Sequence, residues 1–139
     1  MAEKSSGFSA AEKAAMKERA KELKAQQNRE ESTRAQRETI AALPQPDRGL
    51  AEGIHAIVTS VAPELTPKLW YGMPGYARDG KIVCFFQPAS KFDARYGTLG
   101  FNDIANLDDG PAWPTAFAVV ELTDAVTKQI AGMVARAVR

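Results

Sequence analysis

Residues 69–87 have the sequence LWYGMPGYARDGKIVCFFQ, and much of the fold can be inferred outward from them. Two segments rich in β-forming residues, Leu69–Ala77 and Lys81–Gln87, flank the tripeptide Arg-Asp-Gly at 78–80. A glycine-containing connection of this length between two such segments is typical of a β-hairpin. We therefore predict two antiparallel strands and a tight turn at Gly80, where glycine supplies the positive φ that the turn needs.

The second strand of this hairpin is apolar on both faces. With the two-residue period of a strand, Ile82, Cys84 and Phe86 share one face, and Val83 and Phe85 share the other. A strand with this pattern belongs in the middle of a sheet with cover on each side. Further strands and helices must therefore pack around it.

The flanking segments provide those strands and helices. Apolar residues recur at helical spacing in a segment that ends at Pro63, and Thr123 caps a second amphipathic helix near the end of the chain. Between them, Ala94–Phe101 and Thr115–Leu122 are predicted strands, and Asn102–Leu107 is a predicted short helical turn. We predict an α+β fold, with an antiparallel sheet of about four strands packed with helices.

The N-terminal part of the chain differs in composition from the rest. Residues 1–45 hold nine Lys and Arg, seven Asp and Glu, and one of the eleven aromatic residues. Ser9 and Glu12 have the spacing of a capping box, and strong helix formers follow as far as Gln27. A solvated helix and a basic helix that docks on an anionic surface are both open interpretations. We predict a charged N-terminal helical extension over residues 1–37.

Composition excludes several classes of protein. The 139 residues include 18 Lys and Arg against 17 Asp and Glu, so no general attraction to nucleic acid or membrane is expected. The single cysteine cannot form an internal disulfide, and with the single histidine it cannot complete a four-ligand zinc site. No apolar run approaches the ~20 residues of a transmembrane helix. The polar start lacks the apolar core of a secretory signal, so we expect a cytoplasmic protein.

Two motifs point to enzymatic chemistry, and each has a simpler interpretation. The spacing of Gly75, Gly80 and Lys81 fits a phosphate-binding loop, but Ile82 replaces the required Ser or Thr, and the segment joins two strands. Cys84 could act as a nucleophile only with the lone histidine, and its place in a predicted core strand favours an inert side chain. We therefore expect no catalytic residues and a protein that is not an enzyme.

Three carboxylates fall in one short segment, at Asp103, Asp108 and Asp109. Carboxylates are hard oxygen ligands that suit calcium, magnesium or ferrous iron. The spacing is not that of an EF-hand, because Ala105 and Leu107 occupy alternate positions. A weak metal site and a set of capping and turn carboxylates are the two interpretations.

Aromatic residues crowd the stretch from residue 70 to residue 113, and a domain of this size needs most of them in its core. A groove with walls formed by Trp70 and Tyr71, and with Lys91 and Arg95 at its mouth, can hold a small anionic ligand. Interleaved aromatics and cations also suit single-stranded nucleic acid, but the near-zero net charge argues against it.

The hairpin region also carries a family resemblance. The stretch from Ala62-Pro63-Glu64 through Trp70–Pro74, followed by Asp79–Lys81 and the pair Phe85-Phe86, resembles the YdhG-like family of bacterial proteins. The resemblance also includes the sequence FQPASK at residues 86–91 and extends over about residues 38–139. It implies a compact YdhG-like α+β domain over that range.

Some members of this family are described as frataxin-like iron chaperones. They bind ferrous iron through surface carboxylates and deliver it for iron–sulfur or haem assembly. The resemblance therefore implies Fe(II) as a weakly bound cargo, iron–sulfur or haem assembly proteins as partners, and Asp103, Asp108 and Asp109 as the residues to test. The alternative function is a binding domain for a small anionic ligand, using the aromatic groove.

Overall fold

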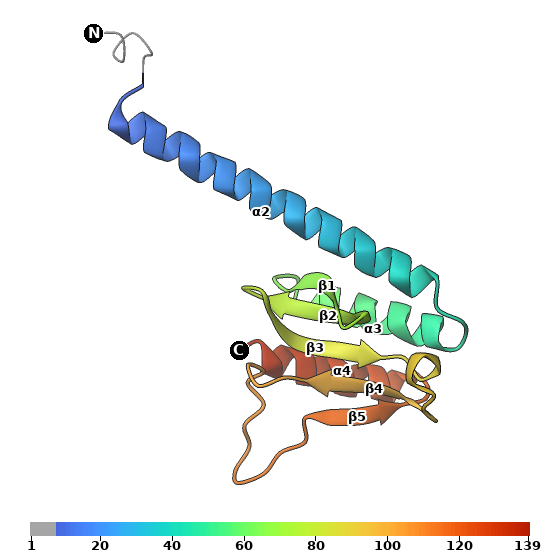
Figure 1. The fold of residues 1–139 in the computed structure, drawn as a ribbon. Helices are drawn as coiled ribbons and strands as arrows, with labels where there is room; N and C mark the ends of the chain where they lie inside the picture. Colours follow the sequence, from blue (N-terminus) through green and yellow to red (C-terminus); the bar gives the residue numbers. More distant parts are fainter. Residues whose placement is uncertain (1–7) are drawn as a thin grey trace. The chain divides into compact units, whose positions relative to one another are not determined.

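The computed structural model of the protein describes residues 8–139, so the first seven residues of the predicted extension lie outside it (Figure 1). Within this range the helices and the sheet confirm the predicted α+β fold. The elements are, in chain order, α2 (Ala10–Ala41), α3 (Asp47–Val61), β1 (Thr66–Trp70), β2 (Met73–Arg78), β3 (Lys81–Gln87), η1 (Ser90–Phe92), β4 (Gly97–Phe101), β5 (Ala116–Val119) and α4 (Asp124–Ala137).

The chain divides after Glu31 into two compact units, and helix α2 runs through the boundary. In the first unit the Glu12 backbone nitrogen donates to Ser9 Oγ at 3.1 Å, and the Ser9 nitrogen donates to Glu12 Oε1 at 3.2 Å. The predicted capping box is therefore confirmed. An exposed ion pair between Arg19 and Glu22, 3.6 Å apart, adds local support to the helix.

In the second unit five strands form one antiparallel sheet in the order β1-β2-β3-β4-β5. Strand β3 is central, as its two apolar faces predict. Ile82 does not share the face of Cys84 and Phe86 as expected, because a register shift at Val83 turns it to the face of Gly75. The expected strand Leu69–Ala77 is wrong as a single element, because the chain reverses at Tyr71 and Gly72, whose φ angles are 51° and 76°. The sheet therefore has five strands rather than four. The predicted turn before β3 is confirmed, with φ angles of 51° at Asp79 and 79° at Gly80.

The strands after the hairpin are shorter than the sequence predicts. Strand β4 starts at Gly97 rather than at Ala94, because the Ala94 nitrogen donates to the Ala89 oxygen at 2.9 Å and the chain bends at Arg95 and Tyr96. The segment that follows β4 is a turn and not a helix, closed by a hydrogen bond of 2.9 Å from the Ala105 nitrogen to the Asn102 oxygen.

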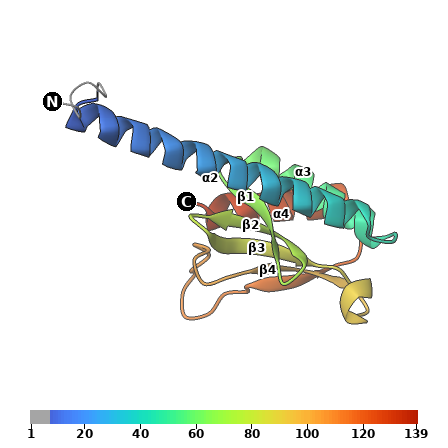
Figure 2. The ribbon, with the colours of Figure 1, turned by 45° about the horizontal axis from the view of Figure 1, so that its top comes forward.

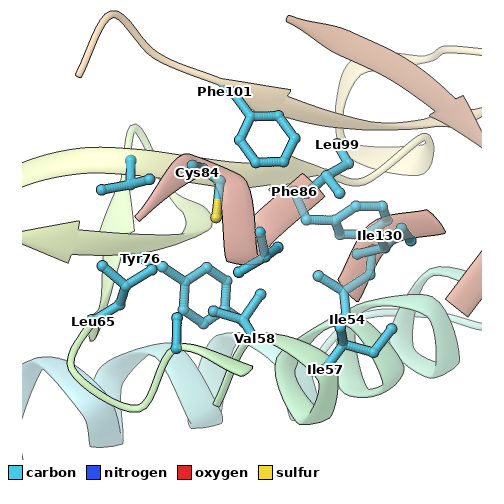
Figure 3. Packing of buried hydrophobic residues seen from close by; sticks show 14 of the residues in the cluster. Ile54, Ile57, Val58, Leu65, Tyr76, Cys84, Phe86, Leu99, Phe101 and Ile130 are labelled. Atoms are coloured by element: carbon cyan, nitrogen blue, oxygen red, sulfur yellow. The ribbon is translucent and has the colours of Figure 1, made fainter. Parts of the chain in front are cut away.

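Helices α3 and α4 cover one face of the sheet (Figures 1 and 2). Figure 3 shows the core between them, where side chains of α3 and α4 meet those of β2, β3 and β4. Helix α4 starts as predicted, with the Val126 nitrogen donating to Thr123 Oγ1 at 3.2 Å. The largest fully buried core side chains include Tyr76, Phe86, Ile54, Leu99 and Ile130.

The last ten residues of α2, Ser32–Ala41, belong to the second unit and join this layer. The fully buried Gln36 donates from Nε2 to the Gly75 oxygen at 2.6 Å and to the Lys68 oxygen at 3.1 Å. Ile40, one turn later, is part of the hydrophobic core. Because Lys68 and Gly75 are paired across β1 and β2, Gln36 fixes the position of the β1–β2 hairpin.

Candidate functional site

The face of the sheet turned away from α3 and α4 carries a cleft of about 480 Å³. Its orientation follows from Gly75, which precedes the core residue Tyr76 and so faces the opposite side. A Cβ atom built on Gly75 would lie 3.1 Å from Ile82 Cδ1 and 3.4 Å from Trp70 Cβ, and both of these residues line the cleft. The volume falls within the range of about 300–1,000 Å³ that is typical of small-molecule sites.

Three segments far apart in the sequence line the cleft. Strand β1 and the following turn contribute residues 68–71, the β2–β3 turn and the start of β3 contribute 80–82, and the chain after β4 contributes 102–104. Since β2 and β3 separate β1 from β4 in the sheet, the first and last segments form opposite walls. The lining residues are Lys68, Leu69, Trp70, Tyr71, Gly80, Lys81, Ile82, Asn102, Asp103 and Ile104.

The first wall is aromatic. Trp70 packs on Phe85 with ring centroids 4.8 Å apart, and it meets Tyr71 edge-on at 5.0 Å. Phe85 in turn lies over Gly100, where an added Cβ would overlap its ring. Tyr71 is 81 % exposed because the positive-φ turn directs it away from the sheet. The structure therefore brings Trp70 and Tyr71 together, as the sequence analysis expected, and supports Trp70 from beneath.

The cations of the cleft differ from those selected in the sequence. Lys68 and Lys81 line it, whereas Lys91 and Arg95 do not. Lys91 Nζ donates to the Gly72 oxygen at 2.9 Å and so lies beside the turn that carries Tyr71. The Arg95 guanidinium lies 5.2 Å from the ring centroid of Tyr96.

The second wall depends on an irregularity in the sheet. The register between β2 and β3 shifts between Tyr76 and Ala77, and this bulge leaves Val83 of β3 without a partner residue in β2. The Asn102 nitrogen donates to the Val83 oxygen at 3.0 Å, which ties the chain leaving β4 to the bulged part of β3. Bulges commonly redirect side chains next to binding sites. Here the bulge holds Asn102 and Asp103 beside the cleft.

The three carboxylates selected for a metal site are divided by the fold. Asp103 lines the cleft, whereas Asp108 and Asp109 follow the buried Leu107 and are exposed outside it. Among residues 8–139 no group of three or more His, Cys, Asp or Glu side chains is close enough to hold one metal ion.

A second, smaller cavity of about 210 Å³ lies between the last turns of α2 and helix α3, next to His55. His55 Nδ1 is 3.1 Å from the hydroxyl of Tyr76, so one imidazole nitrogen is hydrogen-bonded. Burial, and then the nearby Arg37 charge, lower the pKa of His55 below 6.5. The residues that line this cavity are Arg37, Ile40, Ala41, Glu52 and His55.

Cys84 is fully buried in the core beside Tyr76, its partner across β2 and β3. Burial raises the pKa of the Cys84 thiol to about 12, and burial followed by the proximity of Cys84 raises the pKa of Tyr76. The thiol is therefore protonated at neutral pH, which agrees with its interpretation as a small core side chain.

Comparisons with protein-family models, with curated proteins and with solved structures found no match to this chain. No helix within the described residues is both long enough and apolar enough to cross a membrane.

Proposed function

We propose that this protein is a non-enzymatic cytoplasmic domain that binds a small anionic ligand in the cleft beside Trp70. The observation that carries this proposal is the convergence of free polar side chains on an aromatic wall. Lys68, Lys81, Asn102 and Asp103 all line the cleft, and within the described part of the chain none of these side chains has a hydrogen bond or ion pair. A few unpaired polar groups around an apolar platform are typical of a ligand site.

The charge of the lining favours an anion. Lys68 and Lys81 carry two positive charges and Asp103 carries one negative charge, which leaves a net charge of +1. Lys68 and Lys81 take the role that residue spacing suggests for Lys91 and Arg95, because they line the cleft and Lys91 and Arg95 do not. An aromatic ring stacked on Trp70 would place an attached acid group within the field of the two lysines.

Phenyl phosphate is a suitable probe, because it combines one aromatic ring with one phosphate group. We expect Trp70→Ala to weaken its binding about tenfold through lost stacking. Lys68→Ala and Lys81→Ala should each weaken it about two- to fivefold, the range for partly exposed charge pairs. Isothermal titration calorimetry measures all three effects.

The matched controls are Trp113→Ala and Lys91→Ala. Trp113 is the other tryptophan of the chain and does not line the cleft, and Lys91 is a lysine outside it. Neither substitution should change the affinity for phenyl phosphate. Equal losses from Lys91→Ala and Lys68→Ala would move the anion site to the Tyr71–Gly72 turn and contradict the proposal.

Weak binding of ferrous iron is the second candidate, and it comes from the family resemblance. Its support in the structure is the exposure of Asp108 and Asp109 in the segment that also holds Asp103. On this proposal the protein delivers Fe(II) to iron–sulfur or haem assembly proteins. An anaerobic Fe(II) titration tests it. Iron would be favoured over the anionic ligand if Asp108→Asn and Asp109→Asn weaken Fe(II) binding and Trp70→Ala leaves it unchanged.

A further inference from the structure

We infer that the ligand of the cleft is a purine mononucleotide or a close analogue, with a bicyclic ring that donates N–H groups from its edge and with one phosphate. This inference rests on the proposed binding of an anion in the same cleft and adds the chemical class of the ligand. Such a site needs three features close together: a rigid ring for stacking, a phosphate site and a side chain that accepts hydrogen bonds from the ring edge.

Trp70 provides the platform. Its ring contacts the ring of Phe85 at 4.8 Å and that of Tyr71 at 5.0 Å between centroids, and these two contacts restrain it before a ligand arrives. A pre-ordered side chain loses little conformational freedom on binding, which favours affinity. Nucleobases stack well on tryptophan, and a bicyclic purine covers the indole more fully than a single ring does.

The phosphate site lies at the lysines. Lys81 directly follows Gly80, and a Cβ built on Gly80 would meet no atom within 4 Å, so this end of the cleft is open. Lys68 approaches the cleft from β1. A ring stacked on Trp70 can therefore direct its ribose and phosphate past Lys68, which is level with Gly75 in the sheet, toward the open end, where Lys81 lies.

Asp103 is the side chain suited to read the ring edge. It stands on the wall opposite Trp70, beside Asn102, and its carboxylate has no partner among the described residues. A carboxylate only accepts hydrogen bonds and can accept two neighbouring N–H groups at once. The guanine edge offers such a pair, from the ring N–H and the exocyclic amine. A carboxylate beside a phosphate site would repel a ligand that carries only a phosphate. A ligand with an N–H edge would instead form hydrogen bonds with Asp103.

The test compares guanosine 5′-monophosphate, phenyl phosphate and ribose 5-phosphate by titration calorimetry on the full chain. Guanosine 5′-monophosphate carries ring, N–H edge and phosphate, phenyl phosphate lacks the edge, and ribose 5-phosphate lacks the ring. We expect the nucleotide to bind about tenfold more tightly than phenyl phosphate, as one good paired contact to a base edge would give. Ribose 5-phosphate should bind more weakly than both.

Asp103→Asn separates edge recognition from general electrostatics. The substitution removes one negative charge, so it should leave phenyl phosphate binding unchanged or slightly tighter. If Asp103 accepts from the ring edge, the same variant should bind guanosine 5′-monophosphate about tenfold more weakly. The matched control is Asp108→Asn, a carboxylate outside the cleft, which should change neither affinity.

The outcomes distinguish the two proposals. Two results would overturn the nucleotide inference and leave the anion site intact. One is that Asp103→Asn binds both ligands more tightly. The other is that the unmodified chain binds the nucleotide and phenyl phosphate with equal affinity. Failure of all three ligands to bind would overturn the proposed function as well. In the variant Trp113→Phe, Trp70 is the remaining tryptophan, so quenching of its fluorescence by the nucleotide, but not by ribose 5-phosphate, supports stacking.

Discussion

The ring of Phe85 on β3 lies directly over Gly100 on β4, its partner across the two strands, in the space that any larger side chain at 100 would fill. Trp70 then packs on Phe85. The aromatic wall of the cleft therefore depends on the absence of a side chain on β4, three strands away from Trp70 on β1.

Gly100→Ala tests this dependence. The added methyl group must displace the Phe85 ring, so we expect the free energy of unfolding to fall by about 1–3 kcal/mol. Urea denaturation measures this change, and near-ultraviolet circular dichroism should report the altered packing of Trp70. The control is Gly132→Ala in α4, where nothing lies within 4 Å; there we expect a gain of about 0.5–1 kcal/mol from the lower flexibility of alanine. Equal and small effects at the two positions would contradict the described packing.

The turn at Tyr71–Gly72 gives a second prediction. Gly72 has a positive φ, and a Cβ there would also collide with Lys91 Nζ. Gly80 has nearly the same φ with no atom within 4 Å. Alanine at either position should cost about 1–2 kcal/mol of backbone strain, and Gly72→Ala should cost about 0.5–1 kcal/mol more, because Lys91 must release the Gly72 oxygen. In the Lys91→Ala background this difference should disappear in urea denaturation.

Cys84 gives a prediction about reactivity and alkaline pH. Because burial holds its pKa at about 12, above the usual 9.0, the folded protein should not react with Ellman's reagent at pH 8, whereas the unfolded chain should react rapidly. Above pH 9 the unfolded chain loses the thiol proton and the folded one keeps it. Stability should therefore fall as pH rises, by up to about 1.4 kcal/mol per unit from this group. Cys84→Ala should remove that part of the pH dependence; rapid labelling of the folded chain would contradict the prediction.

His55 gives a prediction about acid pH, where stability should fall as pH decreases. Burial and Arg37 lower its pKa in the folded state, so the unfolded chain binds the proton first as pH falls below 6.5. The stabilisation from neutral His55 is complete above pH 6.5 and is lost as pH falls through the folded pKa. His55 is the only histidine, so its imidazole resonances in a nuclear magnetic resonance titration need no assignment. A pKa at or above 6.5 would contradict the burial of the ring, and Arg37→Gln should raise the pKa.

The sequence predicted the elements whose signals are local. The Asp79–Gly80 turn, the Thr123 cap and the central position of β3 each depend on a few neighbouring residues, and each is confirmed. The turn at Tyr71–Gly72 was missed, because a tyrosine at positive φ has no local signal and the residues on both sides favour strands.

The sequence predicted the aromatic residues of the cleft but not its polar residues, and the reason is different. Trp70 and Tyr71 stand out by residue type, but the importance of Lys68, Lys81 and Asn102 arises from pairing between strands. The bulge at Val83, which holds Asn102 in place, depends on the register of two strands and not on a motif. Residue spacing therefore suggested Lys91 and Arg95, whereas the sheet brings other cations to the aromatic wall.

The most direct test of the proposed ligand site is a titration of the ¹⁵N-labelled protein with phenyl phosphate, followed by amide chemical shifts. We predict saturable shifts confined to the three segments that line the cleft, residues 68–71, 80–82 and 102–104, with Asp108 and Asp109 unaffected. Amide shifts that stay flat to high millimolar concentrations, or that saturate around Lys91 and Arg95 instead, would contradict the assignment of this cleft as the binding site.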